Sequence, residues 1–540
     1  MMSSLVRQRS LMSVAALSRA HATAAPAAPA ASASLQQSAE WLRARPFEEM
    51  PGPRPLPLVG NLWRFLPPLG EFRKLDPVGL LVAIRERYGD IAKVVGVPFK
   101  QPMVYIFNPD DIQKIYRYEG PWPMRGSIQS VSYYRTVTRR DWFQGDIGVI
   151  FSEGEKWLES RRKVNRPMMQ PRSAKQYMAP IDSIALEFVD RMLDLRDENG
   201  KMPLDFKNEL NKWSLESISL VALDARLGCL ERNLPADSEQ QRLIDATLVI
   251  FECMLQLDLQ PSPWRYVSTP AWRRLVKALD CSYEVSMRHI TRALERIRAR
   301  GDESQSTGEL SVLEKLLISS DDPRIAIVMA LDMMFGGIDT TANAVATTLY
   351  FLAKNPHAQQ KLYLELCTKH PDPTTPLTAE ILEDCKFLKA CVKEALRLRP
   401  VSIINMRRVL VDDLVLSNFR VPRGVDVVAS HFVITNSEEH FPQASQFMPE
   451  RWVKDAAGNC PARQVHPFAY LPFGFGPRMC VGKRFAEYEI HALLARIVRR
   501  FHVDYEGEVS WKTTVMHMID SPLTFKITER RPSIAQEVRV

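Results

Sequence analysis

The chain has 540 residues, and its 46% hydrophobic and 25% charged content is that of a globular protein large enough to fold without disulfides. A net charge of +8 is mild for this length, and no run of Lys and Arg resembles a nucleic-acid-binding arm, so we expect no nucleic-acid partner. The charge reflects either simple solubility or a basic patch for an acidic partner. The eight cysteines form no C-x-x-C pair, which argues against a disulfide framework and a zinc centre.

Residues 1–45 are predicted to be a mitochondrial transit peptide. They contain no acidic residue before Glu40 and carry Arg7, Arg9 and Arg19 among many Ser and Ala residues, with apolar residues at roughly helical spacing. The alternative is a disordered tail without function. This segment holds nothing close to the ~18 to 20 apolar residues of a membrane span. We therefore expect a mitochondrial protein on the matrix side of the inner membrane, associated with it peripherally.

Residues 46–60 are predicted to form a Pro-rich strap, because the run from Pro51 to Pro57 contains four prolines that stiffen the chain. Such a strap would orient the body of the protein relative to whatever the leader approaches. Nothing later in the sequence looks like a linker. Residues 61–540 are therefore predicted to form one large catalytic domain.

Helix patterns dominate the body, and strand patterns are few and short. Helices are expected at residues 77–88, 109–116, 153–169, 207–226, 236–256, 270–300, 323–353 and 384–398, with a last helix starting near Cys480. Strands are expected at 91–97, 103–107, between 410 and 430, and within 503–527, with an irregular stretch at 441–479. The predicted fold class is mainly α with a small β region.

One cysteine lies in a glycine-rich loop directly before a helix. Residues 473–482 read Phe-Gly-Phe-Gly-Pro-Arg-Met-Cys-Val-Gly. A metal-bound thiolate needs its negative charge stabilised, and backbone N–H groups at a tight Gly turn and at a helix N-terminus do this. The glycines let the backbone lie against a flat macrocycle, and Arg478 can pair with a carboxylate such as a porphyrin propionate.

This loop resembles the haem-binding loop of the cytochrome P450 family, F-G-x-G-x-R-x-C-x-G, at every fixed position, including Phe473, Arg478 and Gly482. The resemblance covers about residues 50 to 530. It implies a P450 fold with haem b (iron protoporphyrin IX) between the long central helix and the Cys loop. Cys480 would then be the proximal thiolate, which pushes electron density onto iron and favours O–O cleavage. The alternative is a structural Cys in a chance Gly-rich loop.

The middle of the longest predicted helix carries Gly336-Gly337-Ile338-Asp339-Thr340-Thr341. Each Gly in a helix interior costs ~1 kcal/mol relative to Ala, so the pair needs a reason. Alone it would equally fit a helix kink. It resembles the family's oxygen-binding groove, which implies that Thr340 hydrogen-bonds O₂ and that Asp339 relays protons.

Glu394 and Arg397 share one face of the helix predicted at 384–398, and Pro449-Glu450-Arg451-Trp452 follows some fifty residues later. An isolated pair of this kind is usually a solvated salt bridge worth under ~1 kcal/mol. Together the two segments resemble the family's E-x-x-R and P-E-R-F elements, with Trp452 in place of the usual Phe. The resemblance implies a structural ion-pair network of Glu394, Arg397 and Arg451.

Trp157 and Arg161 form a W-x-x-x-R pattern that resembles the family's helix at the haem edge, and both side chains would hold a propionate. Arg408 lies where the family often places another propionate partner. Arg407 beside it leaves that choice open.

Lys389 and Lys393 lie on one helix face, in a segment that resembles L-K-A-x-x-K-E of the mitochondrial, ferredoxin-dependent branch of animals. Lys483 and Arg484, just past the thiolate, resemble its basic C-x-G-[RK]-R. The resemblance implies that an acidic iron–sulfur ferredoxin docks on this basic proximal face. Scattered surface lysines are the alternative.

The implied activity is monooxygenation: one oxygen atom from O₂ enters a lipophilic substrate, steroid-like or xenobiotic, with electrons from NADPH through ferredoxin reductase and ferredoxin. The substrate pocket would be lined by residues from about 120 to 150 and from 236 to 275. Two other classes stay open: a haem-thiolate isomerase or dehydratase without a redox partner, and a non-enzymatic haem sensor or carrier. Nothing in the sequence separates a biosynthetic from a detoxifying role.

Overall fold

The computed structural model describes residues 39–66, 70–126, 128–300, 310–320, 322–410, 413–455 and 457–530. The chain divides into two compact units, residues 1–44 and 45–540, and the fold below is that of the second unit. Most of the predicted transit peptide therefore lies outside the described residues.

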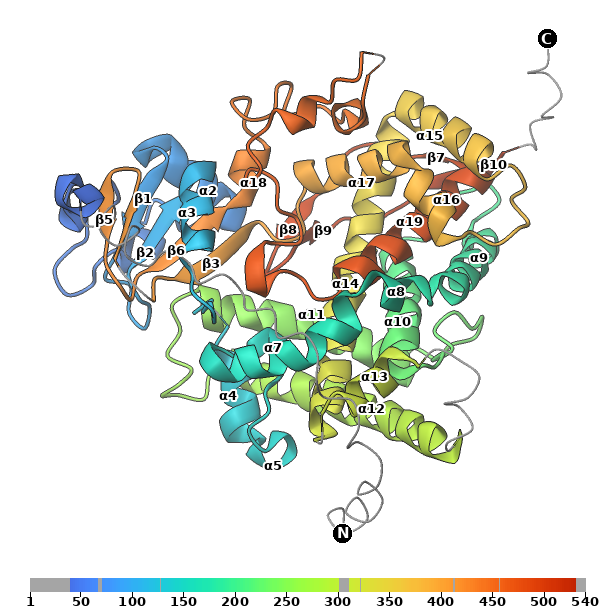
Figure 1. Cartoon of the computed structure of the whole chain (residues 1–540), viewed down its shortest axis with the longest axis horizontal. Helices are drawn as coiled ribbons and strands as arrows, with labels where there is room; N and C mark the ends of the chain where they lie inside the picture. The colour runs from blue at the N-terminus through green and yellow to red at the C-terminus, as the bar shows by residue number, and fades with distance from the viewer. Residues whose placement is uncertain are drawn as a thin grey trace, which may run out of the picture. The chain divides into compact units, whose positions relative to one another are not determined.

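The fold class is mainly α with a small β region, as predicted (Figure 1). The predicted helices form close to their expected positions, and their ends differ by at most about four residues. The α-helices are α2 (Pro77–Tyr88), α3 (Pro109–Arg117), α4 (Ser130–Tyr133), α5 (Arg140–Phe143), α6 (Gly148–Phe151), α7 (Gly154–Met169), α8 (Pro171–Lys175), α9 (Met178–Leu195), α10 (Phe206–Leu223), α11 (Glu239–Met254), α12 (Pro270–Arg300), α13 (Val312–Ile318), α14 (Arg324–Lys354), α15 (Pro356–Lys369), α16 (Ala379–Asp384), α17 (Lys386–Leu398), α18 (His431–Thr435) and α19 (Lys483–Arg500).

A four-stranded sheet has the order β1-β2-β6-β3, in which β2 and β6 are parallel and the other two pairs are antiparallel. With α2, α3 and α18 it forms the β-rich side of Figure 1, and most of the helices lie on the other side. Three two-stranded sheets pair β4 with β5, β7 with β10, and β8 with β9. The strands are β1 (Ile91–Val94), β2 (Met103–Ile106), β3 (Ile404–Arg408), β4 (Leu414–Leu416), β5 (Phe419–Val421), β6 (Asp426–Ser430), β7 (Phe501–Asp504), β8 (Trp511–Thr513), β9 (His517–Ile519) and β10 (Lys526–Glu529).

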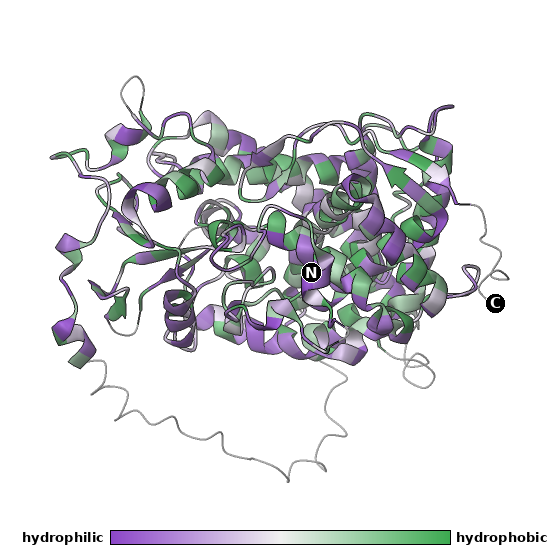
Figure 2. Ribbon diagram, turned by 90° about the horizontal axis from the view of Figure 1, so that it is seen from above, coloured by the Kyte–Doolittle hydropathy of each residue, from purple (hydrophilic) through white to green (hydrophobic). Residues whose placement is uncertain are grey.

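The long helix α14 runs through the helical core. It is long and apolar enough to cross a membrane, but 72% of its most hydrophobic window is buried inside the protein, as in the core helix of a globular fold. α14 packs most closely against α10, where a Cβ on Gly337 would lie 2.5 Å from Cγ1 of Ile218. Gly337 therefore allows a close helix crossing. Hydrophobic and hydrophilic residues alternate along many of the helices (Figure 2), the pattern of helices that bury one face.

Candidate active site

The loop that carries Cys480 is a tight, glycine-dependent turn. Gly474 and Gly476 have φ values of +72° and +71°, a region that other residues rarely adopt. The backbone N–H of Cys480 donates to the carbonyl of Phe473 at 2.9 Å. The Cys480 side chain is exposed, whereas Cys229, Cys253, Cys385 and Cys391 are buried.

Two arginines hold this loop from outside. Arg125 donates to the carbonyl of Arg478 at 3.0 Å, and Arg161 of α7 donates to the carbonyl of Met479 at 3.0 Å. The Cys480 side chain reaches solvent, but the protein around it removes much of the water from the thiol. This desolvation raises the pKa of the thiol. The backbone N–H of Gly482 and the charges of Arg161 and Arg125 oppose that rise, because they favour the thiolate.

Arg478 is buried and points away from solvent. Its Nε donates to the carbonyl of Pro123 at 2.8 Å, Nη2 donates to the carbonyl of Ser152 at 2.8 Å, and its guanidinium lies 4.0 Å from the ring centroid of Trp157. Burial lowers the pKa of Arg478 to about 8, and the neighbouring cations Arg125, Arg407 and Arg161 add to this, while Glu153 opposes it. Arg125, Arg161, Arg407 and Arg478 thus form one arginine cluster beside the thiol.

Arg408 does not belong to this cluster. Adjacent residues of a strand face opposite sides, and Arg408 of β3 makes a two-pronged ion pair with Asp426 of β6, at 2.7 and 3.0 Å. Arg407 faces the other way, pairs with the buried Glu119 and lies over the ring of Tyr116 at 4.8 Å. Arg408 was the first choice as propionate partner, with Arg407 left open, and the geometry favours Arg407.

The cluster has the chemistry of a site for a dianionic macrocycle. Glu119 pairs with Arg407 within it, and two buried donors have no hydrogen-bond partner in the part of the chain that the structure describes: Nε1 of Trp157 and Nε of Arg161. Buried donors of this kind are normally satisfied. Two propionates beside Trp157 and Arg161 would supply both the missing acceptors and the missing negative charge, so the residues fit haem.

The segment for which the sequence predicts an oxygen groove, Gly336–Thr341, lies in the middle of α14. A Cβ on Gly336 would meet Cδ1 of Ile150 of α6 at 3.5 Å, an ordinary contact, so the glycine leaves room on that side. The Thr340 hydroxyl donates to the carbonyl of Gly336 at 2.7 Å and keeps its lone pairs available.

Asp339 is 2% exposed and faces α10. Neither carboxylate oxygen has a hydrogen-bond partner among the described residues. Burial raises the pKa of Asp339 to about 7, against the opposing effects of Lys207 and Asn211, both on α10. A carboxyl with a pKa near neutrality is suited to proton transfer. Lys207 and Asn211 lie in no recognisable motif, so the sequence alone does not mark them as neighbours of Asp339.

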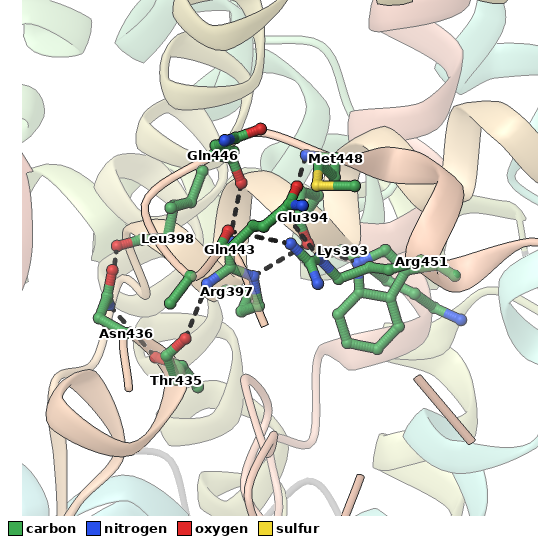
Figure 3. Close-up of polar contacts among 12 residues, drawn as sticks. Lys393, Glu394, Arg397, Leu398, Thr435, Asn436, Gln443, Gln446, Met448 and Arg451 are labelled. Atoms are coloured by element: carbon green, nitrogen blue, oxygen red, sulfur yellow. Dashed lines mark hydrogen bonds and ion pairs between the residues drawn. The ribbon is translucent and has the colours of Figure 1, made fainter. Parts of the chain in front are cut away.

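Glu394, Arg397 and Arg451 form the predicted ion-pair network, and their side chains point toward one another (Figure 3). All three are buried. Arg397 also donates to the carbonyl of Thr435 at 2.7 Å, and Arg451 to that of Pro442 at 3.0 Å. The network therefore ties α17 to α18 and to the segment before residue 452.

The basic residues predicted to bind a ferredoxin separate into two groups. Burial lowers the pKa of Lys393, and the cations Lys389 and Lys483 lower it further against Glu487, so these three lysines lie near one another. Arg484 is turned away, because its Nε donates to the carbonyl of Met169 at 2.8 Å. We define Lys389, Lys393 and Lys483 as the proximal lysine group.

A cavity of about 370 Å³ lies between the sheet and the connection from α11 to α12. Its lining includes Gly126, Gln129 and residues 257–262, which fall within the ranges expected for the substrate pocket. Leu255 and the aromatic residues Phe72 and Trp264 add apolar surface. The lining is suited to an apolar ligand.

The sequence matches one protein family over nearly the whole body: the model described as Cytochrome P450 covers residues 50–527. The probable cytochrome P450 301a1, mitochondrial, of Drosophila melanogaster is 41% identical over 496 residues, which span 92% of this chain and 89% of the relative. Cytochrome P450 12b1, mitochondrial, of Drosophila acanthoptera is 38% identical over 479 residues, 87% of each chain. The chain therefore belongs to the cytochrome P450 family, and it is a mitochondrial haem monooxygenase.

Proposed function

We propose that this chain inserts one oxygen atom from O₂ into a lipophilic substrate, steroid-like or xenobiotic, with electrons from NADPH that arrive through ferredoxin reductase and a mitochondrial ferredoxin. The observation that carries the proposal is the exposed thiol of Cys480, on a loop whose backbone is held by Arg125 and Arg161. A haem b bound beside Cys480 would supply the activation of O₂, and the electrons from NADPH would allow one oxygen atom to enter the substrate and the other to leave as water.

In this proposal Cys480 would hold the haem iron, and Trp157 and Arg161 would donate to a propionate. Arg407 and Arg125 complete the propionate site in place of Arg408, which is committed to Asp426. Arg478 stacks on Trp157 and keeps the indole in position. Phe473 and Gly482 shape the loop on either side of the thiolate.

Asp339 and Thr340 deliver protons at the proposed oxygen groove. Because its pKa is near 7, Asp339 can both take up and release a proton at neutral pH. Thr340, one residue further along α14, positions a hydroxyl at the groove beside Gly336. Proton supply through these two side chains determines how much of the NADPH consumed leads to oxygenated product.

The proximal lysine group is the proposed docking site of the ferredoxin. Lys393 is exposed, and Lys389 and Lys483 add positive charge beside it. An acidic carrier would relieve the mutual repulsion of these lysines, which favours association there. Arg484 contributes positive potential from its place against α7 without presenting its guanidinium in the same way.

Exposed apolar side chains support a peripheral membrane contact. The backbone N–H of Leu56 donates to the carbonyl of Gly60 at 2.9 Å and closes a turn that leaves Leu58 fully exposed. The backbone N–H of Asn61 donates to the carbonyl of Val95, which lies on the β1–β2 connection. That connection carries Phe99, 61% exposed, whose ring lies 5.6 Å from that of Tyr266. Apolar groups at such a surface insert favourably into a bilayer interface. We propose attachment to the matrix face of the inner membrane.

The test is reconstitution of the purified holoenzyme with NADPH, ferredoxin reductase and ferredoxin against a panel of steroids, secosteroids and apolar xenobiotics. Oxygenated product that requires ferredoxin supports the proposal. A product formed without any reductant would indicate an isomerase or dehydratase. Tight haem binding without turnover of any compound, and without substrate-dependent NADPH use, would indicate a haem sensor or carrier.

A further inference from the structure

Asp258 lines the 370 Å³ cavity and lies in a wide π-helical turn (Leu255–Leu259) that continues α11. The residue is 7% exposed. A π-turn displaces the chain from the helix axis and is often found at functional sites. Here it directs a carboxylate from the α11–α12 connection toward the start of α4.

The Asp258 carboxylate caps the N-terminus of α4, although Asp258 follows Ser130 by 128 residues in the sequence. Oδ1 accepts from the backbone N–H of Gln129 at 3.1 Å and from that of Ser130 at 2.9 Å, and Oδ2 accepts from the Ser130 hydroxyl. These are charge-assisted bonds, about twice as strong as neutral ones. The α11–α12 connection and α4 are therefore held together by one side chain.

A second bond ties the same residue to the sheet. Nζ of Lys100, on the β1–β2 connection, donates to the backbone carbonyl of Asp258. Gln129, Lys100 and Asp258 all line the cavity, which Arg265, Arg408 and Asp426 also face. Three segments that are distant in sequence thus meet at Asp258, and all three line the same cavity.

We propose that Asp258 is a specificity-determining positioning residue, which ties the α11–α12 connection to α4 and to the β1–β2 connection and so limits the size of ligand that can enter. The inference rests on the proposed function, because it takes the cavity as the route by which a ligand reaches the haem. Burial raises the pKa of Asp258 to about 6, while Ser130, Gln129 and Lys100 oppose the rise. The carboxylate is therefore mostly ionised, and the cap intact, at neutral pH.

The experiment measures how fast two haem-binding azoles of different size enter and leave the holoenzyme, by stopped-flow absorbance at the Soret band. Imidazole is the small probe and clotrimazole the bulky one. The variants are Asp258→Ala and Ser130→Ala, which keeps the buried carboxylate. The matched control is Asp280→Ala, because Asp280 also joins two elements, through Tyr134 at 2.6 Å and Arg139, but does not line this cavity.

We expect Asp258→Ala to accelerate clotrimazole entry and release roughly 10-fold, the scale of one lost bond to a charged group, and to leave the imidazole rates unchanged. Ser130→Ala should act in the same direction, and should add little in the Asp258→Ala background. Equal effects on both azoles, or a result no different from Asp280→Ala, would overturn the inference. A wild-type protein without a thiolate-type haem spectrum would instead contradict the proposed function.

Discussion

The indole N–H of Trp452 donates to Oε2 of Glu394 at 2.7 Å. Oε2 also accepts from Nε of Arg397 at 3.0 Å, while Oε1 accepts from Arg397, from Nε of Arg451 and from the backbone N–H of Met448. The buried carboxylate is thereby satisfied on both oxygens. The departure from the family's usual Phe at this position thus adds a hydrogen bond to the ion-pair network.

We predict that Trp452→Phe lowers the free energy of unfolding by about 1.5–3 kcal/mol, because a hydrogen bond to a buried charge is lost. The variant should still bind haem and lose it at a lower temperature than the wild type. Thermal unfolding followed at the Soret band checks this. Trp511→Phe is the control, since the ring of Trp511 stacks on His517 at 5.2 Å and its indole N–H bonds no carboxylate among the described residues. Equal shifts in the two variants would count against a special role for Trp452.

Arg407 and Arg408 should differ in their effect on haem retention. Arg407→Gln combined with Glu119→Gln removes the buried cation without leaving an unpaired carboxylate. We expect this pair to release haem at least about 10-fold faster, the cost of one lost charged hydrogen bond to a propionate. Arg408→Gln with Asp426→Gln is the matched control and should release haem at the wild-type rate. Transfer of haem to apomyoglobin measures both. The reverse order would restore Arg408 as the propionate partner.

Asp339→Asn should slow coupled turnover by roughly 10- to 100-fold, because Asn cannot supply a proton. Haem content and substrate-induced spectral shifts should stay unchanged. The ratio of product formed to NADPH consumed is the decisive quantity, and we expect it to fall. Glu489→Gln is the control: Glu489 is another fully buried carboxyl, on α19, and should leave that ratio unchanged. Unaltered coupling in Asp339→Asn would remove Asp339 from the proton path.

The same two carboxyls predict a pH dependence of stability. Burial raises the pKa of Asp339 from 3.8 to about 7 and that of Glu489 from 4.5 to about 8. The folded state then binds protons that the unfolded chain releases, so each carboxyl costs stability as the pH rises through this window. As the pH rises from about 5 to about 8, the unfolding free energy of Asp339→Asn should therefore increase by about 2–3 kcal/mol relative to that of the wild type. Glu489→Gln should show the same sign. Denaturant unfolding at both pH values is the check, and a constant difference would mean that Asp339 is ionised at pH 5.

Charge reversal in the proximal lysine group should weaken ferredoxin binding. For Lys389→Glu with Lys393→Glu we expect the KM for ferredoxin to rise at least about 10-fold, with little change in kcat at saturating ferredoxin. The KM should also become less sensitive to salt. Arg273→Glu with Lys277→Glu reverses a similarly spaced, exposed basic pair on α12 and serves as the control. A similar rise in both double variants would reflect overall charge and would contradict a local docking site.

Local patterns were enough for most of the fold, because long amphipathic helices carry their own periodicity. Local patterns did not predict α15, which is separated from the end of α14 by Asn355 alone. Its first residue, Pro356, starts a helix rather than ending a helical region. Helix α9 was also missed. The expected strands between 410 and 430 formed, but β3 lies before them, at 404–408.

The motif residues of the site could be named from the sequence, because each lies in a short pattern. Arg125 could not, and the sequence left Arg407 only as an alternative to Arg408. Arg125 bonds a carbonyl 353 residues away, and Arg407 pairs with a carboxylate 288 residues away, so no local spacing marks either contact. The choice between Arg407 and Arg408 depends on which face of β3 meets the cluster, and strand alternation alone does not decide it.

The most direct test of the central claim is the carbon monoxide spectrum of the reduced protein, wild type against Cys480→His. The account predicts that the wild-type Soret band lies at the strongly red-shifted position of thiolate-ligated haem. It predicts that the variant either loses haem or moves to the position of imidazole-ligated haem. A wild-type spectrum that the substitution leaves unchanged would show that Cys480 does not bind the iron.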